Sequence, residues 1–201
     1  MDYLTENWLE ILGTLVGVLY LYWEYRASMK VWVAGIIMPA LSLGVYWKAA
    51  LYADFGINVY YLVAAVYGYM VWRFGGDKKK QALPITSTPG RAWLPLGLAF
   101  LAAFLLMGYV LENFTDSTVP WWDSFTTALS IVGMFMLARK WVEQWLVWIL
   151  VDVVSAGLYV FKDIHFYAAL YAVYAVVAVF GYFEWKRQIQ GQNHTPQFSA
   201  S

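Results

Sequence analysis

The chain has 201 residues, of which 62% are hydrophobic and 13% are charged, and it contains 12 Trp, 16 Tyr and no Cys. This composition excludes an ordinary soluble domain and predicts an integral membrane protein. The lack of Cys excludes a disulfide framework and thiol chemistry, and a formal net charge of zero gives no sign of nucleic-acid binding.

The predicted elements are helices. The first residues, MDYLTEN, lack the basic segment of a cleaved signal peptide, so the first apolar run is expected to remain as a span. Seven apolar runs have roughly the 17 to 25 residues that cross a bilayer. None alternates polar and apolar residues as barrel strands do, so we predict an all-α membrane protein with seven transmembrane helices. The runs lie at about 7–24, 31–48, 52–73, 93–111, 123–138, 143–161 and 164–185.

Positively charged residues predict the orientation of these helices. With the N-terminus outside, only Lys48 and Lys162 lie in outer loops, and the positive-inside rule then places the C-terminus in the cytoplasm. The loop GGDKKKQALPITSTPGR is polar and connects the third and fourth helices. The tail after Arg187 is polar and is expected to be disordered. The inner residues are Arg26, Lys30, Arg73, Lys78, Lys79, Lys80, Arg91, Arg139, Lys140, Lys186 and Arg187.

An internal repeat indicates a duplication. A shift of about 113 positions places the first three helices on the last three without a gap. A fourth helix between two three-helix copies keeps the copies parallel, so the predicted architecture is 3+1+3. It comprises a first repeat at 1–73, a cytoplasmic loop and linker helix at 74–120, a second repeat at 121–186 and a polar cytoplasmic tail at 187–201. Coinciding pairs include Trp8 and Trp121, Arg26 and Arg139, Trp32 and Trp145, Tyr61 and Tyr174, Gly68 and Gly181, and Trp72 and Trp185.

Parallel repeats are typical of transporters, whose substrate site lies near the midplane between the two halves. The copies should differ where they hold an asymmetric ligand. Three differences stand out, since Asp152 replaces Pro39, Trp148 replaces Gly35, and Tyr171 replaces Asn58. The proline in the first copy can kink its helix.

Asp152 is the strongest candidate for a binding residue. A carboxylate at membrane depth costs about 2.5 to 3.5 kcal/mol, so it should face the bundle interior. Trp145, Trp148 and Asp152 are spaced to lie along one helical face. Indole rings beside an acid suit a flat, cationic, aromatic ligand. The alternative is a structural Asp that is protonated or bonded to a neighbouring hydroxyl.

Other candidates carry weaker signals. Asp123 and Asp54 suit the capping of a helix as well as a ligand site, and Thr127 suits bonding within the bundle. His165 is expected at the outer interface rather than in catalysis. The predicted substrate-binding set is Trp145, Trp148, Asp152, Asn58, Asp123, Thr127, Tyr61 and Tyr171, with no catalytic or metal-binding residues and no cofactor.

The segments LYADFGINVYYLVAAVYGYMVW and WWDSFTTALSIVGMFMLARKWVEQWLVWILVDVVSAGLY resemble the Pnu family of bacterial vitamin transporters. The resemblance runs from Trp8 to Trp185 and is most distinctive in RKWVEQWLVW. It implies a SWEET-like 3+1+3 fold in the bacterial inner membrane and facilitated diffusion of an unphosphorylated vitamin, which a cytoplasmic kinase or pyrophosphokinase then traps. The resemblance alone also implies a homotrimer as one state of assembly.

One departure bears on the substrate. Nicotinamide riboside members of the family carry a Trp-x-x-x-Asn motif in the sixth helix, where this chain has Trp148 and Asp152. Their second-helix Asn falls near Met38 and Pro39. An Asp favours a cation with an amino edge, as in thiamine, and the resemblance extends to the thiamine-carrying branch. Nicotinamide riboside is also a cation and remains the alternative within the family.

Functions of other classes fit less well. The last helix has no lysine for the Schiff base of a retinal protein, and no nucleophile with its base or cluster of His and carboxylates indicates an enzyme. A SWEET-like sugar carrier remains open, although it would not require a buried acid, and so does a structural or assembly subunit. The expected mechanism is alternating access by rocking of the two three-helix repeats.

Overall fold

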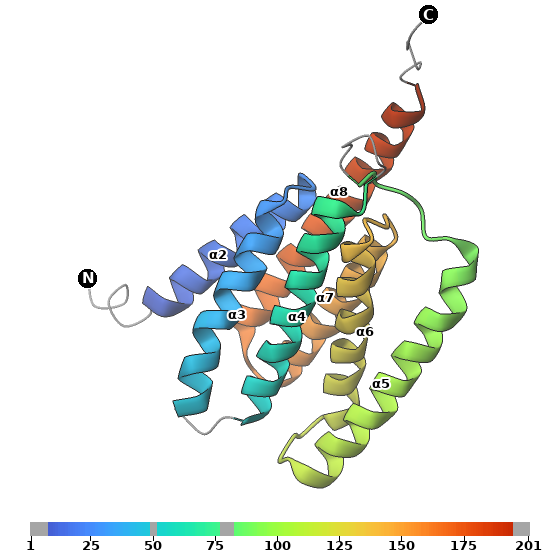
Figure 1. The fold of residues 1–201 in the computed structure, drawn as a ribbon. Coiled ribbons are helices and arrows are strands. Elements are labelled where there is room, and N and C mark those ends of the chain that lie inside the picture. The colour runs from blue at the N-terminus through green and yellow to red at the C-terminus, as the bar shows by residue number, and fades with distance from the viewer. Residues whose placement is uncertain (1–7, 49–51, 77–82, 195–201) are drawn as a thin grey trace, which may run out of the picture. The chain divides into compact units, whose positions relative to one another are not determined.

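The computed structural model describes residues 8–48, 52–76 and 83–194, without the side chains of 8–15, 45, 46, 48, 52–54, 193 and 194. The described residues form seven α-helices and one short 3-10 helix, and they contain no strand (Figure 1). The predicted all-α fold with seven helices is therefore confirmed. The helices are α2 (Trp8–Tyr25), α3 (Lys30–Lys48), α4 (Tyr52–Phe74), α5 (Trp93–Phe114), α6 (Pro120–Ala138), α7 (Gln144–Phe161) and α8 (His165–His194), with η1 (Gly90–Ala92) preceding α5.

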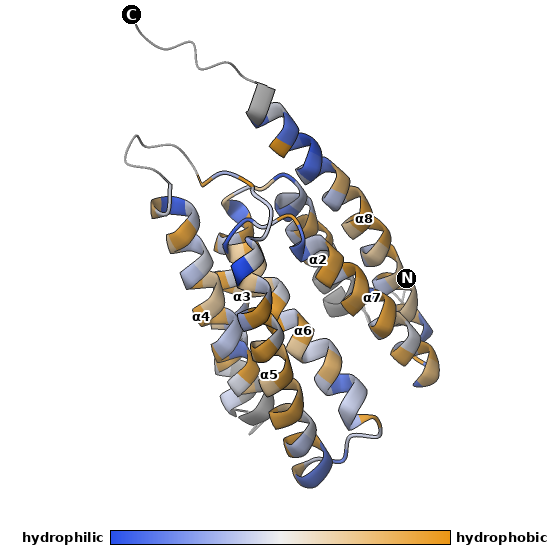
Figure 2. Ribbon diagram, turned by 90° about the vertical axis from the view of Figure 1, so that its right-hand side faces the viewer, coloured by the Kyte–Doolittle hydropathy of each residue, from blue (hydrophilic) through white to orange (hydrophobic). Residues whose placement is uncertain are grey.

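Apolar surface covers much of these helices. Four described segments are long and apolar enough to cross a membrane, namely Phe55–Phe74, Gly90–Phe114, Gln144–Phe161 and His165–Gln192, and Lys30–Gly44 is a shorter apolar helix. Large side chains on α5 point outward, among them Leu94 at 72% and Leu106 at 65% exposure. Figure 2 shows hydrophobic colouring along α5 and polar colouring at the end of α8. Such exposed apolar faces suit lipid rather than water, so the chain is a multi-pass membrane protein.

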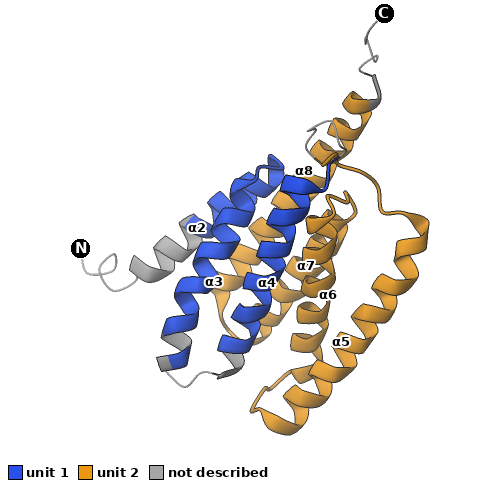
Figure 3. Ribbon diagram, in the orientation of Figure 1, with its two compact units in different colours: residues 1–82 blue, residues 83–201 orange. Residues whose placement is uncertain are grey.

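The chain divides into two compact units, residues 1–82 and residues 83–201 (Figure 3). In unit 1, α3 packs on α4 through Trp32, which is fully buried. A Cβ on Gly68 would overlap the Trp32 ring, so the glycine permits the close approach. Trp72 meets the same ring edge-on, with the ring centroids 5.4 Å apart and an interplanar angle of 84°.

Unit 2 contains the same kind of contact between α7 and α8. Trp145 is fully buried, and a Cβ on Gly181 would lie 2.7 Å from its ring. Trp185 meets Trp145 edge-on, at 5.7 Å between centroids and an interplanar angle of 89°. In each unit, the second of these Trp residues lies one turn after the glycine, so both lie on one helical face.

The fourth predicted helix, α5, belongs to unit 2 and packs on α6. Gly108 lies against the Trp121 ring, and Phe104 meets Trp121 edge-on at 5.4 Å. Phe100 and Phe125 form a second edge-on pair at 5.7 Å. The boundary between the units falls after residue 82, within the predicted linker at 74–120, so that α5 belongs to the same unit as the second predicted repeat.

The segment before α5 is strapped to the turn between α6 and α7. Thr86 N–H donates to the Lys140 carbonyl at 3.0 Å, and Val142 N–H donates to the Thr86 carbonyl at 2.9 Å. The Thr88 N–H and hydroxyl both donate to Glu143 Oε2, at 2.6 and 2.7 Å. The second half of the predicted loop is thus ordered by hydrogen bonds. We call residues 85–88 the strap.

Helix α8 is longer than the apolar run that predicts it. It continues to His194, so the expectation of disorder after Arg187 is wrong for residues 188–194. Glu184 pairs with Arg187 at 2.6 Å and accepts a hydrogen bond from Gln188 Nε2 at 3.0 Å. Such pairs, three and four residues apart, stabilise a helix beyond the apolar part of the sequence. Residues 195–201 lie outside the described part of the chain.

Candidate functional site

Trp148 and Asp152 lie one turn apart on α7, as their spacing predicts. Trp148 packs on α6 at Gly133, where an added Cβ would lie 3.3 Å from the indole ring. Its indole Nε1 is buried and has no hydrogen-bond partner among the described residues. A buried donor without a partner carries a desolvation cost of about 1 to 3 kcal/mol unless a ligand or water satisfies it. Trp148 therefore offers both a ring and an unused N–H group.

Asp152 is a buried acid in the membrane part of α7, with 7% of its surface exposed. No described residue gives its carboxylate a hydrogen bond or an ion pair. The hydroxyl of Tyr174 on α8 lies in electrostatic range of this carboxylate. Ser155, one turn further along α7, is also buried. Because an unpaired acid at this depth is costly, Asp152 is the centre of the candidate site.

Trp145 and Trp148 do not form one platform, although their spacing suggested a common face. Trp145 packs against Gly181 and Trp185 of α8, whereas Trp148 packs against Gly133 of α6. Trp145 has no exposed surface. Its packing on α8 gives it a structural role, and its stacking on a ligand stays a prediction.

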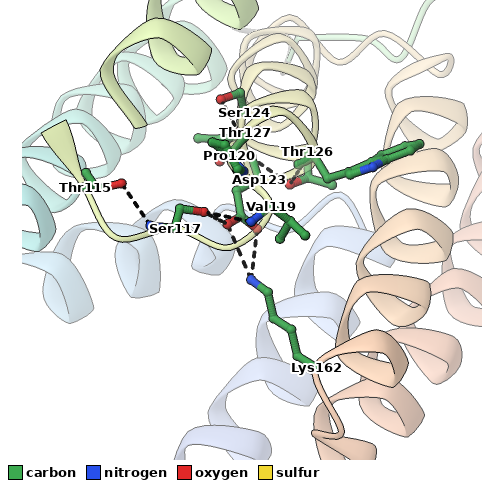
Figure 4. A network of polar contacts seen from close by, with 10 residues as sticks. Thr115, Ser117, Val119, Pro120, Asp123, Ser124, Thr126, Thr127 and Lys162 are labelled. Atoms are coloured by element: carbon green, nitrogen blue, oxygen red, sulfur yellow. Dashed lines mark hydrogen bonds and ion pairs between the residues drawn. The ribbon is translucent and has the colours of Figure 1, made fainter. Parts of the chain in front are cut away.

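Asp123 is engaged in a polar network at the start of α6 (Figure 4). Lys162, at the end of α7, forms an ion pair with Asp123 at 3.2 Å. Ser117 Oγ donates to Asp123 Oδ2 at 2.9 Å. The Thr127 hydroxyl donates to the Asp123 backbone carbonyl at 2.7 Å. These partners satisfy both residues within unit 2, and their role in substrate binding stays a prediction.

Tyr171 belongs to a chain of tyrosine rings between α7 and α8. It stacks on Tyr159 with centroids 5.2 Å apart and contacts Tyr174 at 5.7 Å. Tyr159 also stacks on Tyr167 at 5.4 Å. The row leads from the end of α7 to Tyr174, which lies near Asp152. Tyr171 is therefore one ring away from the candidate site.

The remaining predicted residues belong to unit 1. Asn58 and Tyr61 are half-buried on α4, one turn apart. Tyr61 contacts the Tyr60 ring at 5.6 Å, and its hydroxyl lies in electrostatic range of Tyr20 on α2. The Asp54 side chain lies outside the described residues.

Gln144 is a buried polar residue outside the predicted substrate-binding set. It is fully buried at the start of α7, and neither its amide nitrogen nor its amide oxygen has a hydrogen-bond partner among the described residues. The repeat offers a signal for it, since the residue 113 positions earlier is the apolar Val31. No group of three or more His, Asp or Glu in the described residues could hold a metal ion. The arrangement on α7 provides an aromatic ring, a polar amide and an acid.

Apolar helices that carry buried polar groups, as α7 does at Gln144 and Asp152, are typical of membrane proteins with a functional site at membrane depth, among them transport proteins. A profile of the nicotinamide mononucleotide transporter family matches residues 7–187. The chain therefore belongs to that family. Its relatives are transporters and not enzymes.

Two relatives and one solved structure illustrate the similarity. The nicotinamide riboside transporter PnuC of Escherichia coli is 25% identical, over 89% of this chain and 85% of that protein. The riboflavin/roseoflavin transporter RibM of Streptomyces davaonensis is also 25% identical, over 89% and 84%. The crystal structure of the vitamin B3 transporter PnuC matches with a TM-score of 0.70 at 21% identity, covering 94% of this chain and 85% of that one.

Proposed function

We propose that the protein carries an unphosphorylated cationic B vitamin, most specifically thiamine, across the bacterial inner membrane by facilitated diffusion. The observation behind this proposal is Asp152, a buried acid one turn after Trp148 that lacks a hydrogen-bond or ion-pair partner among the described residues. A thiazolium cation and the amino group of the pyrimidine would satisfy the carboxylate, and the Trp148 ring would stack on the flat ligand. Intracellular phosphorylation of the vitamin would drive net uptake.

Nicotinamide riboside is the second candidate. The Escherichia coli relative is named as a transporter of this compound, which is also a flat cation. The acid alone does not separate the two ligands. Thiamine is favoured by its amino group, which donates a hydrogen bond to a carboxylate.

The 3+1+3 plan with parallel, SWEET-like repeats belongs to the same proposal. The Trp-Gly-Trp contacts of the two units, at positions 113 apart, support it. So does the backbone, since Ala27 and Lys140 are also 113 positions apart and both adopt positive φ, at 47° and 53°. In this plan the N-terminus is outside, the C-terminus is cytoplasmic, and transport proceeds by alternating access.

Calorimetric titration of the purified protein with thiamine, and separately with nicotinamide riboside, tests the proposal. The better ligand is then titrated into Asp152→Asn, with Asp116→Asn in the exposed loop before α6 as the control for the same change in charge. We expect Asp152→Asn to weaken thiamine binding by about 1.5 to 3 kcal/mol, the range for hydrogen bonds to charged groups. Tighter binding of nicotinamide riboside would make it the substrate in place of thiamine. Unchanged affinity in Asp152→Asn would remove Asp152 from the site.

A further inference from the structure

One face of α7 carries the polar groups that its counterpart in the first predicted repeat lacks. Residues 144–159 of α7 align with residues 31–46 of α3 at a distance of 113 positions. Only three of the aligned positions gain a polar side-chain group in α7. They are Gln144, Trp148 and Asp152, where α3 has Val31, Gly35 and Pro39. Because the three positions are four residues apart, the new groups lie in a row along one face of the helix.

The polar groups in this row are buried and unpaired. Gln144 has no exposed surface, and its amide nitrogen and amide oxygen have no hydrogen-bond partner among the described residues. The indole Nε1 of Trp148 is in the same condition. Asp152 is 7% exposed. Each such group costs free energy when it is removed from water without a partner, so a row of them indicates a purpose other than stability.

The packing of the helix does not require the amide of Gln144. At the equivalent position of α3, Val31 is also fully buried and also precedes the tryptophan of the Trp-Gly contact. The indole nitrogens of Trp32 and Trp145 are both unpaired, so that feature is common to the two contacts and belongs to the packing. An apolar side chain is thus sufficient before this tryptophan. The amide of Gln144 is an addition that the contact itself does not explain.

We propose that Gln144 binds the hydroxyl-bearing end of the vitamin, which lies lengthwise along α7 between Gln144 and Asp152. This inference rests on the proposed function and adds a second anchor to it. Eight residues of α-helix rise about 12 Å, a distance comparable to the length of two linked rings with a hydroxyalkyl arm. An amide can both donate a hydrogen bond to a hydroxyl group and accept one from it. Asp152 then binds the amino end, and Trp148 stacks on the rings between the two anchors.

Calorimetric titration of the purified, full-length protein tests this assignment with thiamine and with its chloroethyl analogue, in which chlorine replaces the hydroxyl group. The analogue keeps both rings and the positive charge. We expect wild-type protein to bind thiamine about fivefold more tightly, the effect of a hydrogen bond between neutral groups. Gln144→Met should weaken thiamine binding by the same factor and leave the affinity for the analogue unchanged. Gln190→Met, at an exposed position on α8, is the matched control.

Three results would overturn the inference: equal affinity of the wild-type protein for thiamine and its analogue, unchanged thiamine affinity in Gln144→Met, or an equal loss for both ligands in this variant. If nicotinamide riboside is the better ligand, the N-methylnicotinamide cation, which lacks the ribose, takes the place of the analogue. If wild-type protein binds neither vitamin, the proposed function itself fails. That result differs from wild-type binding that the substitution leaves unaffected.

Thermal unfolding in detergent separates a binding role of Gln144 from a structural one. Gln144→Met should not lower the unfolding temperature, because it removes two buried polar atoms that have no partner among the described residues. Gln144→Val, which copies Val31, is the second variant and should lose the preference for thiamine in the same way. A lower unfolding temperature in both variants, or the loss of folded protein in both, would assign Gln144 to the structure and overturn the inference.

Discussion

Unit 1 and unit 2 share a packing contact and differ in the groups around it. Trp32 on Gly68 and Trp145 on Gly181 join the last two helices of each unit in the same way. Unit 1 has Val31 and Pro39 where unit 2 has Gln144 and Asp152. The comparison teaches that the tryptophan contacts, which hold the helices together, are the same in both units, while the units differ in their buried polar residues, Gln144 and Asp152.

The glycines under the tryptophan rings give the largest expected effect. Gly68→Ala and Gly181→Ala should each destabilise the protein by up to about 3 kcal/mol, because the added methyl group overlaps a fully buried ring. Gly44→Ala and Gly157→Ala are matched controls, also 113 positions apart, where a Cβ meets nothing within 4 Å. Thermal unfolding in detergent measures all four. A stable Gly181→Ala beside an unstable Gly68→Ala would show that the two contacts are not equivalent.

The strap should stabilise unit 2 through its hydrogen bonds with the turn between α6 and α7. Thr88→Val removes one of the two hydrogen bonds to Glu143 and should cost about 1.5 kcal/mol, because the acceptor is charged. Thr118→Val, in an exposed loop, is the control. Chemical denaturation followed by Trp fluorescence reports the difference. Equal stability of the two variants would show that the strap does not stabilise the turn.

Lys140, in the turn between α6 and α7, should make the stability of the protein depend on pH, whereas the equivalent turn between α2 and α3 has no titratable residue at this position. Burial lowers the pKa of Lys140 from 10.5 to about 8, whereas the equivalent residue of unit 1 is Ala27. Between these values the unfolded chain binds more protons than the folded one, so stability should rise as the pH increases from about 8 toward 10.5.

Unfolding temperatures measured from pH 7.5 to pH 10 should show this rise in wild-type protein and lose it in Lys140→Met. Lys186→Met, at an exposed position on α8, should keep it. A rise of equal size in Lys140→Met would assign the effect to another group.

The ion pair between Asp123 and Lys162 should have the smallest effect. Both side chains are about one third exposed, at 32% and 29%, so the pair should contribute less than about 1 kcal/mol. A double-mutant cycle with Asp123→Asn and Lys162→Met measures the coupling. Vitamin affinity measured in Asp123→Asn tests the predicted place of Asp123 in the binding site: a weaker affinity would support it, and an unchanged affinity would limit Asp123 to the ion pair.

The sequence predicts the ends of the helices better than it predicts the contacts between them. Apolar length places each of the first six helices within about three residues of its observed ends, because a span must match the bilayer. Helix α8 alone extends more than three residues beyond its run, where polar side chains support the helix through local pairs. Apolar composition therefore predicts the membrane part of each helix, and local pairs of polar side chains decide how far a helix continues beyond it.

Contacts within the site were harder to predict, because they depend on distant residues. Periodicity places Trp145, Trp148 and Asp152 near one another on α7, yet Gly133 and Gly181 decide which helix each ring meets. Lys162, the ion-pair partner of Asp123, is 39 residues away along the chain, at the C-terminal end of α7. Asp152 could be singled out because a buried acid is conspicuous in an apolar run, whatever its neighbours.

The packing of α5 on α6 has a consequence for the synthesis of the protein. The segment with α5 is the most apolar of the four candidate spans, and α6, with its Ser and Thr residues, is not among the four. Polar side chains oppose the entry of a single helix into lipid. Because α5 precedes α6 in the chain, it can enter the bilayer first, and its Phe100 and Phe104 then offer aromatic contacts to Phe125 and Trp121 when α6 follows as the second arm of a helical hairpin.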